Sequence, residues 1–232
     1  MTMFALALGA FILLHVGVAA TPLRAGLVKS IGEGRYRGLF SLASVVVFVW
    51  MIWSFGAARI DPANGLLWSP PDWTRHITAT FVLGGFLLAV TGLLTPGPTL
   101  AGFEGALARP DAAKGVLRVT RHPFLWGVAL WGVGHLFANP EVASIMLFGG
   151  LAAMAVLGTR SIDRKSAARN PAQWETFRAA TSNIPFAAIA QGRNKLALGE
   201  MAPRLVIALL AFAAMAYFHE PVFGARVFDF GA

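Results

Sequence analysis

Two histidines are the only residues with acidic, basic or metal-ligating side chains that lie well inside long apolar runs of the sequence. His15 lies in the run 2–22, and His135 lies in the run 123–138. Asp, Glu, Lys and Arg are confined to the connecting segments or to the ends of the apolar runs. Polar side chains deep in a bilayer are costly and usually functional, so these two histidines are the first candidates for chemistry.

Each of these histidines has two possible roles. A buried neutral imidazole needs a partner for one donor and one acceptor, which a carbonyl or hydroxyl on a neighbouring helix could supply. Alternatively, two imidazoles on facing helices can ligate a haem iron inside a helix bundle. Gly17, Gly132 and Gly134 lie near them in the sequence. Without side chains they could let a flat macrocycle approach the backbone, although glycines also suit close helix packing.

The two histidines are predicted to lie at different depths. His15 is placed inward of the centre of its run, and His135 is placed outward of the centre of its own. At ~1.5 Å per helical residue the offset is roughly 10 Å along the bundle axis. His76 starts the run 76–94 at its outer end. Because its depth is nearer that of His135, His76 is the reserve ligand.

A further pair, Arg121 and His122, stands directly before Pro123, where a helix is expected to start. A cationic pair at a helix N-terminus can hold an anionic group such as a haem propionate or a cofactor carboxylate. The competing interpretation is that the pair only anchors the chain at the membrane surface. His122 and His135 are too far apart on one regular helix to serve a single metal centre.

The elements that position these residues are predicted to be membrane-spanning helices. The 232 residues are 56% hydrophobic and 13% charged, and the mean hydropathy is +0.64. A span needs about 20 apolar residues, so this length and composition fit about six spans in an all-α bundle. The predicted spans are residues 2–22, 39–57, 76–94, 123–138, 142–159 and 202–219.

The distribution of basic residues predicts the orientation. The segments 24–37, 95–121 and 160–204 carry sixteen of the 19 Lys and Arg. By the positive-inside rule these segments are cytoplasmic, which puts both termini outside. The first run lacks a charged residue before it, which favours a retained span over a cleaved signal peptide. The net charge of +8 is thereby explained without a nucleic-acid partner, and the lack of Cys excludes disulfides and thiolate ligands.

The sequence resembles the NnrU family of bacterial integral membrane proteins over nearly its whole length. The resemblance rests on His15 and on the segments 22–24, 32–41, 121–123, 131–139, 147–150, 163–164 and 181–186. It implies a single NnrU-type domain over residues 1–232, embedded in a bacterial inner membrane and surrounded by lipid. The family name also implies a link with denitrification.

Through this family the sequence is similar to the plant 15-cis-zeta-carotene isomerases. That similarity implies haem b, ligated by residues that match His15 and His135, and a lipophilic polyene substrate. It implies cis–trans isomerase chemistry at these two histidines. One departure concerns Gly132, which stands where the plant proteins have a Cys proposed to exchange onto the iron. A ligand exchange of that kind has no counterpart in this sequence.

Two alternative functions remain open at this stage. A non-catalytic haem or redox factor that supports nitric oxide or nitrite reduction would need the same haem ligands. A weaker resemblance to isoprenylcysteine-type membrane methyltransferases rests on the pattern from Arg121 to Gly127 and implies S-adenosylmethionine. The substrate and the oligomeric state are not predicted.

Overall fold

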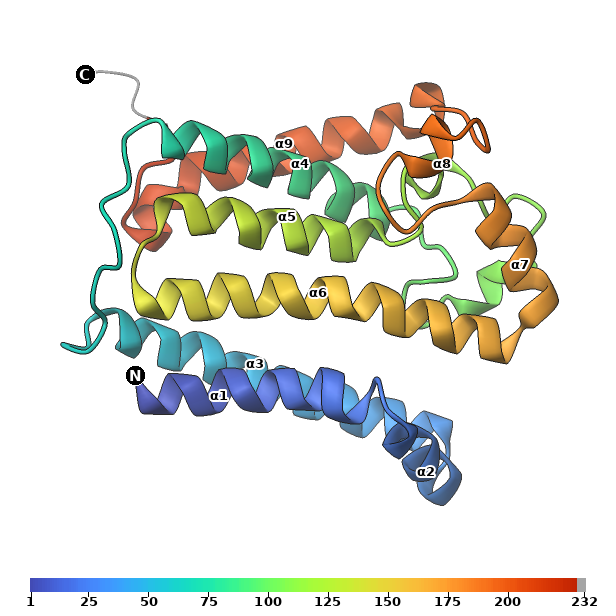
Figure 1. Cartoon of the computed structure of the whole chain (residues 1–232), viewed down its shortest axis with the longest axis horizontal. Helices are drawn as coiled ribbons and strands as arrows, with labels where there is room; N and C mark the ends of the chain where they lie inside the picture. Colours follow the sequence, from blue (N-terminus) through green and yellow to red (C-terminus); the bar gives the residue numbers. More distant parts are fainter. Residues whose placement is uncertain (229–232) are drawn as a thin grey trace.

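Six long helices lie alongside one another in the computed structural model, which describes residues 1–228 (Figure 1). Their bounds are α1 Thr2–Ile12, α3 Glu33–Arg59, α4 Thr74–Leu93, α5 Pro123–Ala138, α6 Val142–Arg169 and α9 Leu198–Phe223. α1 continues into a π-helical turn, η1, at Leu13–Val18. Each predicted apolar run therefore forms a helix. The predicted all-α class is confirmed over the described residues, where the only pairing of extended backbone is an isolated bridge between Leu66 and Glu141.

The helices differ in how well they could cross a membrane. α3, α4, α6 and α9 are each long and apolar enough by themselves. α1 and η1 form a fifth candidate together with α2, Pro22–Ile31, from which they are bent by 80°. α5 has only 16 residues, or about 24 Å, against a hydrocarbon thickness of about 30 Å. The structure thus supports four or five spans by length and composition, and the sixth remains a prediction.

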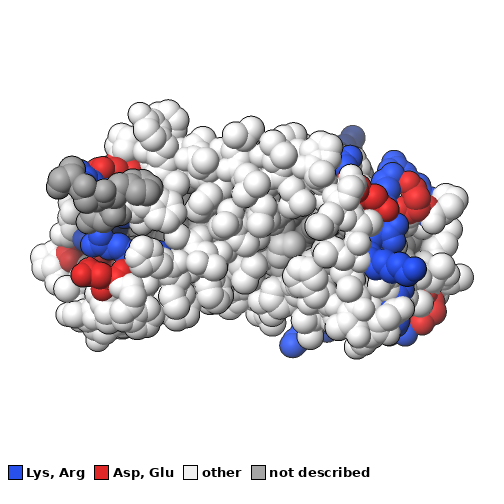
Figure 2. All heavy atoms as spheres, turned by 90° about the horizontal axis from the view of Figure 1, so that it is seen from above, with Lys and Arg blue, Asp and Glu red and all other residues white. Residues whose placement is uncertain are grey.

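The short elements gather at one end of the bundle. They are α2, η2 Glu104–Ala108, η3 Gly115–Arg118, α7 Pro171–Ala180 and α8 Ala187–Ala190. We call this end the basic end, because its segments carry sixteen of the 19 Lys and Arg. Figure 2 shows charged side chains at both ends of the molecule and an uncharged belt between them. That belt is what a lipid-embedded surface requires.

Both termini of the helical bundle lie at the opposite end. The amino group of Met1 forms an ion pair with Asp61, and Arg59 donates a hydrogen bond to the carbonyl of Phe223 at 3.5 Å. Met1 and the end of α9 are therefore on the same side, as the alternation of charges predicts. Which side of the membrane this is remains a prediction.

Glycines allow α4, α5 and α6 to approach closely. A Cβ at Gly127 would lie 2.6 Å from the carbonyl oxygen of Gly85, and one at Gly132 would lie 2.6 Å from that of Phe148. Such contacts are available only to residues without a side chain. α6 then packs through its other face on α1 and α3, where buried residues such as Phe4, Met51 and Phe148 form one apolar cluster. The order of neighbours is α9, α4, α5, α6 and then the pair α1 and α3.

Candidate functional site

A large cavity lies between η1 and α3 on one side and α5 and α6 on the other. Its volume is about 1240 Å³, above the ~300–1,000 Å³ usual for small-molecule sites. The inner part is apolar, with Phe11, Phe40, Phe48, Trp131 and Leu151 in its wall. The segment Pro98–Gly102, which connects α4 to η2, contributes to the cavity wall. An apolar cavity of this size can take a long hydrophobic molecule.

His15 lies on the wall of this cavity, in the π-helical turn η1. Its Nδ1 is 2.9 Å from the carbonyl oxygen of Phe11. Because a carbonyl only accepts, Nδ1 carries a proton, and in the neutral tautomer Nε2 then keeps its lone pair. The ring packs against Phe11 and Phe40, with centroid distances of 4.3 and 5.4 Å. A π-turn often marks a functional position in a helix, and here it places a free imidazole nitrogen at a cavity.

His135 has the same local arrangement one turn before the end of α5. Its Nδ1 donates to the carbonyl of Trp131 at 2.8 Å, which in the neutral tautomer leaves the lone pair on Nε2. Its ring stacks on Phe148 of α6, with centroids 4.5 Å apart and planes 20° apart. A ligand imidazole is typically oriented by a hydrogen bond from its other nitrogen. In donor chemistry, both histidines therefore fit an iron or another metal ion.

The structure does not bring the two histidines together. The cavity reaches Trp131 and stops short of His135. Ile12 lies beside Gly150 of α6, and His15 is three residues further toward the basic end. His135, in contrast, lies at the level of Phe148. The axial offset is then roughly 8 Å, close to the offset expected from the sequence. Ligation of one iron by both imidazoles remains a prediction.

The other predicted site residues lie elsewhere or act in packing. A Cβ at Gly134 would meet the Cβ of Phe81 on α4 at 2.7 Å, and one at Gly132 would meet α6. These two glycines therefore allow close helix packing in this structure, and a role for them in cofactor binding remains a prediction. At Gly17, the nearest atom is the side chain of Leu13 in the same turn, at 2.6 Å. His76 is exposed at the opposite end of the bundle and lines no part of the cavity.

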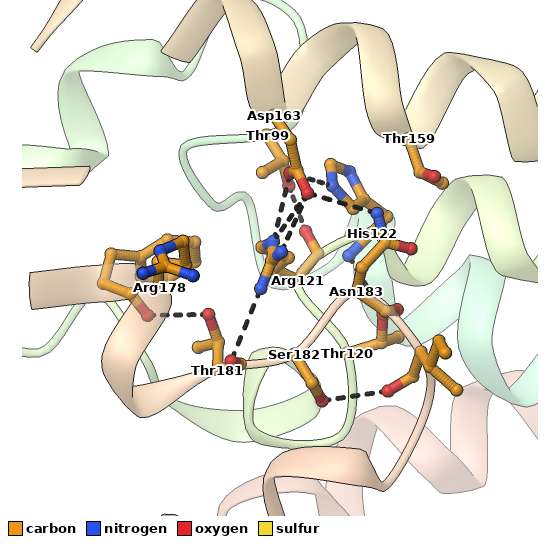
Figure 3. A network of polar contacts seen from close by, with 12 residues as sticks. Thr99, Thr120, Arg121, His122, Thr159, Asp163, Arg178, Thr181, Ser182 and Asn183 are labelled. Atoms are coloured by element: carbon orange, nitrogen blue, oxygen red, sulfur yellow. Dashed lines mark hydrogen bonds and ion pairs between the residues drawn. The ribbon is translucent and has the colours of Figure 1, made fainter. Parts of the chain in front are cut away.

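Arg121 and His122 form a second site, centred on Asp163 of α6 (Figure 3). Arg121 donates to the Asp163 carboxylate through Nε at 3.0 Å and Nη2 at 2.8 Å, and His122 Nε2 lies 2.6 Å from the same carboxylate. Asn183 Nδ2 adds a donor at 3.2 Å. The guanidinium also lies 5.5 Å above the ring of Trp174. The anion that this pair holds in the structure is thus a protein carboxylate, and its contact with a cofactor remains a prediction.

The backbone locks this network in place. Arg121 N–H donates to the carbonyl of Ser182 at 2.9 Å, and the hydroxyl of Thr120 donates to the carbonyl of Asn183 at 2.6 Å. The hydroxyl of Thr99 bonds the carbonyl of Arg121. The bonds to Ser182 and Asn183 connect the loop after α7 to the segment before α5.

His122 is the most buried member of this network, with no exposed side-chain surface. Burial lowers its pKa, and the hydrogen bond to Asp163 only partly opposes this effect. The ring is then neutral, with its proton on Nε2 toward the carboxylate. Nδ1 is buried without a hydrogen-bond partner among the described residues. A neutral, enclosed imidazole is suited to positioning the neighbouring groups.

Asp163 was not predicted as a site residue, although the sequence contained a signal. It is the only acidic residue in the stretch 160–169, which also contains four basic residues. A lone acid in such a stretch commonly pairs with a buried cation. The methyltransferase alternative depends on Arg121 and His122 being available to a cofactor, and their engagement with Asp163 does not favour it. Among residues 1–228 no cluster of three or more His, Asp or Glu side chains could hold a metal ion.

The sequence matches known proteins over almost all of its length. Residues 3–227 match the NnrU protein family. The chain is 31% identical to the chloroplastic 15-cis-zeta-carotene isomerase of Arabidopsis thaliana over 224 residues, which cover 91% of this chain and 58% of that protein. It is 30% identical to the enzyme of the same name from Zea mays over 190 residues, which cover 80% of this chain and 50% of that protein.

The chain thus spans between half and three fifths of the length of these two relatives. No solved structure shows significant similarity to it. The match to the family extends from the start of α1 to beyond the end of α9 and includes both the cavity and the Asp163 network. The chain therefore belongs to the NnrU family.

Proposed function

We propose that this protein is a membrane isomerase that converts a cis double bond of a long conjugated polyene to trans. The named activity of the two plant relatives supplies the reaction class. The observation that carries the proposal is the position of His15 in the wall of a cavity with aromatic and aliphatic residues, with its Nδ1 already bonded to the carbonyl of Phe11. A polyene is apolar along its length, so it can pack against such walls and does not require polar groups in the site.

The proposed cofactor is haem b, with His15 and His135 as its axial ligands. When bound, it would supply a redox-active iron next to the polyene. The structure supports the donor chemistry of each ligand, because each ring is oriented by a hydrogen bond from Nδ1 to the carbonyl four residues earlier. Since the cavity does not reach His135, ligation by both histidines predicts a further approach of α5 to η1 in the haem-bound protein.

The chain's own contribution is to orient a ligand and to exclude water. Phe11 and Phe40 pack on the His15 ring and restrict its rotation. Phe48 and Leu151 contribute further apolar side chains to the cavity wall. A long polyene held in this cavity has few accessible conformations, which fixes the position of its double bonds relative to His15. Entry from lipid fits a site that lies between helices.

The test is an isomerisation assay with the full chain in lipid nanodiscs. The protein is expressed with ample haem, supplied with a 15-cis polyene such as 15-cis-zeta-carotene, and sampled by chromatography that separates the isomers. We expect the trans product to form with the wild type and at least a hundredfold more slowly with His15→Ala. Equal rates for the wild type and for empty nanodiscs would reject the catalytic proposal.

The same preparation separates the non-catalytic alternative. A haem or redox factor would show the haem spectrum and no conversion of polyene.

The location is also proposed: the family resemblance suggests the inner membrane of a bacterium, while the two curated relatives are named as chloroplast proteins.

A further inference from the structure

The cavity that His15 lines becomes strongly basic toward the basic end of the bundle. We call this part of the cavity the mouth. Its wall contains six cationic side chains and a single acidic one, Glu104. The cations are Arg24, Arg37, Arg160, Arg164, Lys165 and Arg169.

Four of these six cations form no ion pair with a carboxylate among the described residues. Arg37 pairs with Glu33 at 2.8 Å and with Glu104 at 3.6 Å, and Arg24 also pairs with Glu33. In contrast, the side chains that line the mouth from α6 form no ion pair within residues 1–228. These side chains are Arg160, Arg164, Lys165 and Arg169, of which Lys165 donates a hydrogen bond to the carbonyl of Ala19 at 3.2 Å. The mouth therefore has unbalanced positive charge, as an anion-binding site requires.

Two buried hydroxyl groups point to a ligand at the same place. Tyr36 of α3 and Ser161 of α6 are each only 6% exposed, and both line the cavity. The Tyr36 hydroxyl and the Ser161 Oγ have no hydrogen-bond partner among the described residues. Buried polar groups are nearly always satisfied, so an unpaired donor calls for an absent acceptor. The guanidinium of Arg24 lies 5.2 Å from the centre of the Tyr36 ring, which places a cation beside that hydroxyl.

Beyond the mouth, the wall is apolar. Phe40, Phe48 and Met154 continue the cavity past His15. A ligand that satisfies both parts has an anionic head and a long hydrocarbon body. A pure hydrocarbon polyene has no group that could accept from the two hydroxyls or balance the arginines.

We propose that the mouth binds the phosphate group of an anionic phospholipid from the surrounding leaflet, with one acyl chain inside the cavity. The mouth lies at the ends of the apolar helices, at the level where lipid headgroups are found. Basic pockets between membrane helices are known to take acidic lipid headgroups. Arg164 and Arg169 balance the charge of the phosphate, and the Tyr36 and Ser161 hydroxyls, which are closed to solvent in this structure, turn toward its oxygens and donate to them. This proposal does not depend on haem or on isomerase activity.

The experiment measures lipids that remain bound to the purified full chain by native mass spectrometry. The protein is equilibrated with mixed micelles that contain dioleoyl phosphatidylglycerol and dioleoyl phosphatidylcholine in equal amounts. We expect one phosphatidylglycerol per chain, retained at least tenfold in preference to phosphatidylcholine. Dodecyl phosphate should displace it, whereas inorganic phosphate at the same concentration should not, because the acyl chain contributes to binding.

Matched variants locate the site. Each basic residue near a lipid surface strengthens binding about fivefold, so Arg164→Gln with Arg169→Gln should weaken retention more than tenfold. The control of equal charge is Arg35→Gln with Lys195→Gln, two exposed basic residues outside the cavity wall. Tyr36→Phe should weaken retention roughly threefold to tenfold through loss of one hydrogen bond. Tyr217→Phe, at a side chain that is 78% exposed, should have no effect.

Three results would overturn the proposal. They are equal retention of the two lipids, equal loss in the cavity and control pairs, and loss of bound lipid when the protein is loaded with haem. The last result would assign the mouth to the haem propionates. Lipid retention is measured without a polyene substrate. The lipid proposal can therefore be rejected while the isomerase proposal stands, and the isomerase proposal can be rejected while the lipid proposal stands.

Discussion

Two regions of this protein use histidine in opposite ways. In the cavity, His15 donates Nδ1–H to its own helix and leaves Nε2 free at the wall. In the Asp163 network, His122 is fully enclosed and donates to a carboxylate. In both arrangements one ring nitrogen has no hydrogen-bond partner among the described residues: Nε2 of His15 belongs to a residue of the cavity wall, whereas Nδ1 of His122 is sealed inside the network. The comparison indicates that the cavity is the place for a ligand and that the network maintains the fold of the basic end.

The largest expected effect is on stability, through the network. Asp163→Ala leaves Arg121 and His122 buried without their anion, and removal of one partner from a buried pair costs about 3–5 kcal/mol. The carboxylate is 20% exposed, so we expect the lower end of this range, about 3 kcal/mol. The measurement is the free energy of unfolding in mixed micelles of a denaturing and a mild detergent.

The control for this prediction is an exposed ion pair. Glu175→Ala removes a carboxylate that pairs with Arg178 on the surface of α7, where both side chains are more than half exposed. Such pairs contribute little, so the stability should not change measurably. If Asp163→Ala were as harmless as Glu175→Ala, the network would not be the structural element described above.

A smaller effect is expected from Gly132, which lies about one helical turn before His135 on α5. Gly132→Ala places a Cβ 2.6 Å from the Phe148 carbonyl and 3.0 Å from the Ala152 Cβ. Overpacking of this kind costs about 1–3 kcal/mol. Gly149→Ala is the control, because nothing lies within 4 Å of its Cβ, and it should be neutral or stabilising. A stable Gly132→Ala protein that loses only a ligand would instead support the predicted cofactor role of this glycine.

A third difference is expected in the dependence of stability on pH. The pKa of His122 is lowered in the folded protein, chiefly by burial, whereas in the unfolded chain it is about 6.5. Below that pH the unfolded state binds a proton that the folded state does not, so stability falls as the pH drops from about 6.5 toward the folded pKa. Above about pH 7 the contribution of His122 is fully present. Melting temperatures between about pH 8 and pH 5 should show this decline.

His122→Gln should flatten that decline, because glutamine does not titrate. The remaining slope would come from the other titratable groups of the chain. An identical pH profile in the wild type and His122→Gln would show that His122 is not the group responsible.

The smallest expected effect on stability is that of His15→Ala itself. The imidazole is only partly buried at the cavity wall, and its one hydrogen bond is to its own helix. Loss of that bond and of two ring contacts should cost about 1 kcal/mol or less. Thermal melting in detergent tests this, and a loss as large as that of Asp163→Ala would make His15 a structural residue.

The sequence predicts the helices better than their contacts. Each apolar run forms a helix because a chain in lipid must satisfy its backbone internally, and hydropathy alone reveals such runs. The π-turn at Leu13–Val18, which orients His15, has no signature in the apolar pattern. The 80° bend before α2 lies at Thr21-Pro22, where the residue before the proline is extended, so the sequence contained a signal for it inside the predicted span 2–22.

The pairing of Asp163 with Arg121 was harder to predict because 41 residues lie between them in the sequence and the contact forms only when α6 extends beyond the membrane. α6 runs from Val142 to Arg169, ten residues further than the predicted span. The predicted boundary at residue 159 placed Asp163 in a loop. Hydropathy ends where the charged residues begin, whereas helical structure continues, since arginine and lysine are good helix formers.

The most direct test of the central claim, that the free histidine nitrogens ligate an iron, is the visible absorption spectrum of the purified protein expressed with ample haem. Two neutral imidazoles should give low-spin iron with a sharp Soret band and resolved visible bands on reduction. His15→Ala and His135→Ala should each convert the iron toward high spin and release haem more readily. His122→Ala and His76→Ala should keep the low-spin spectrum. A folded wild-type protein without Soret absorption, or a spin change in His76→Ala instead of His15→Ala, would contradict the account.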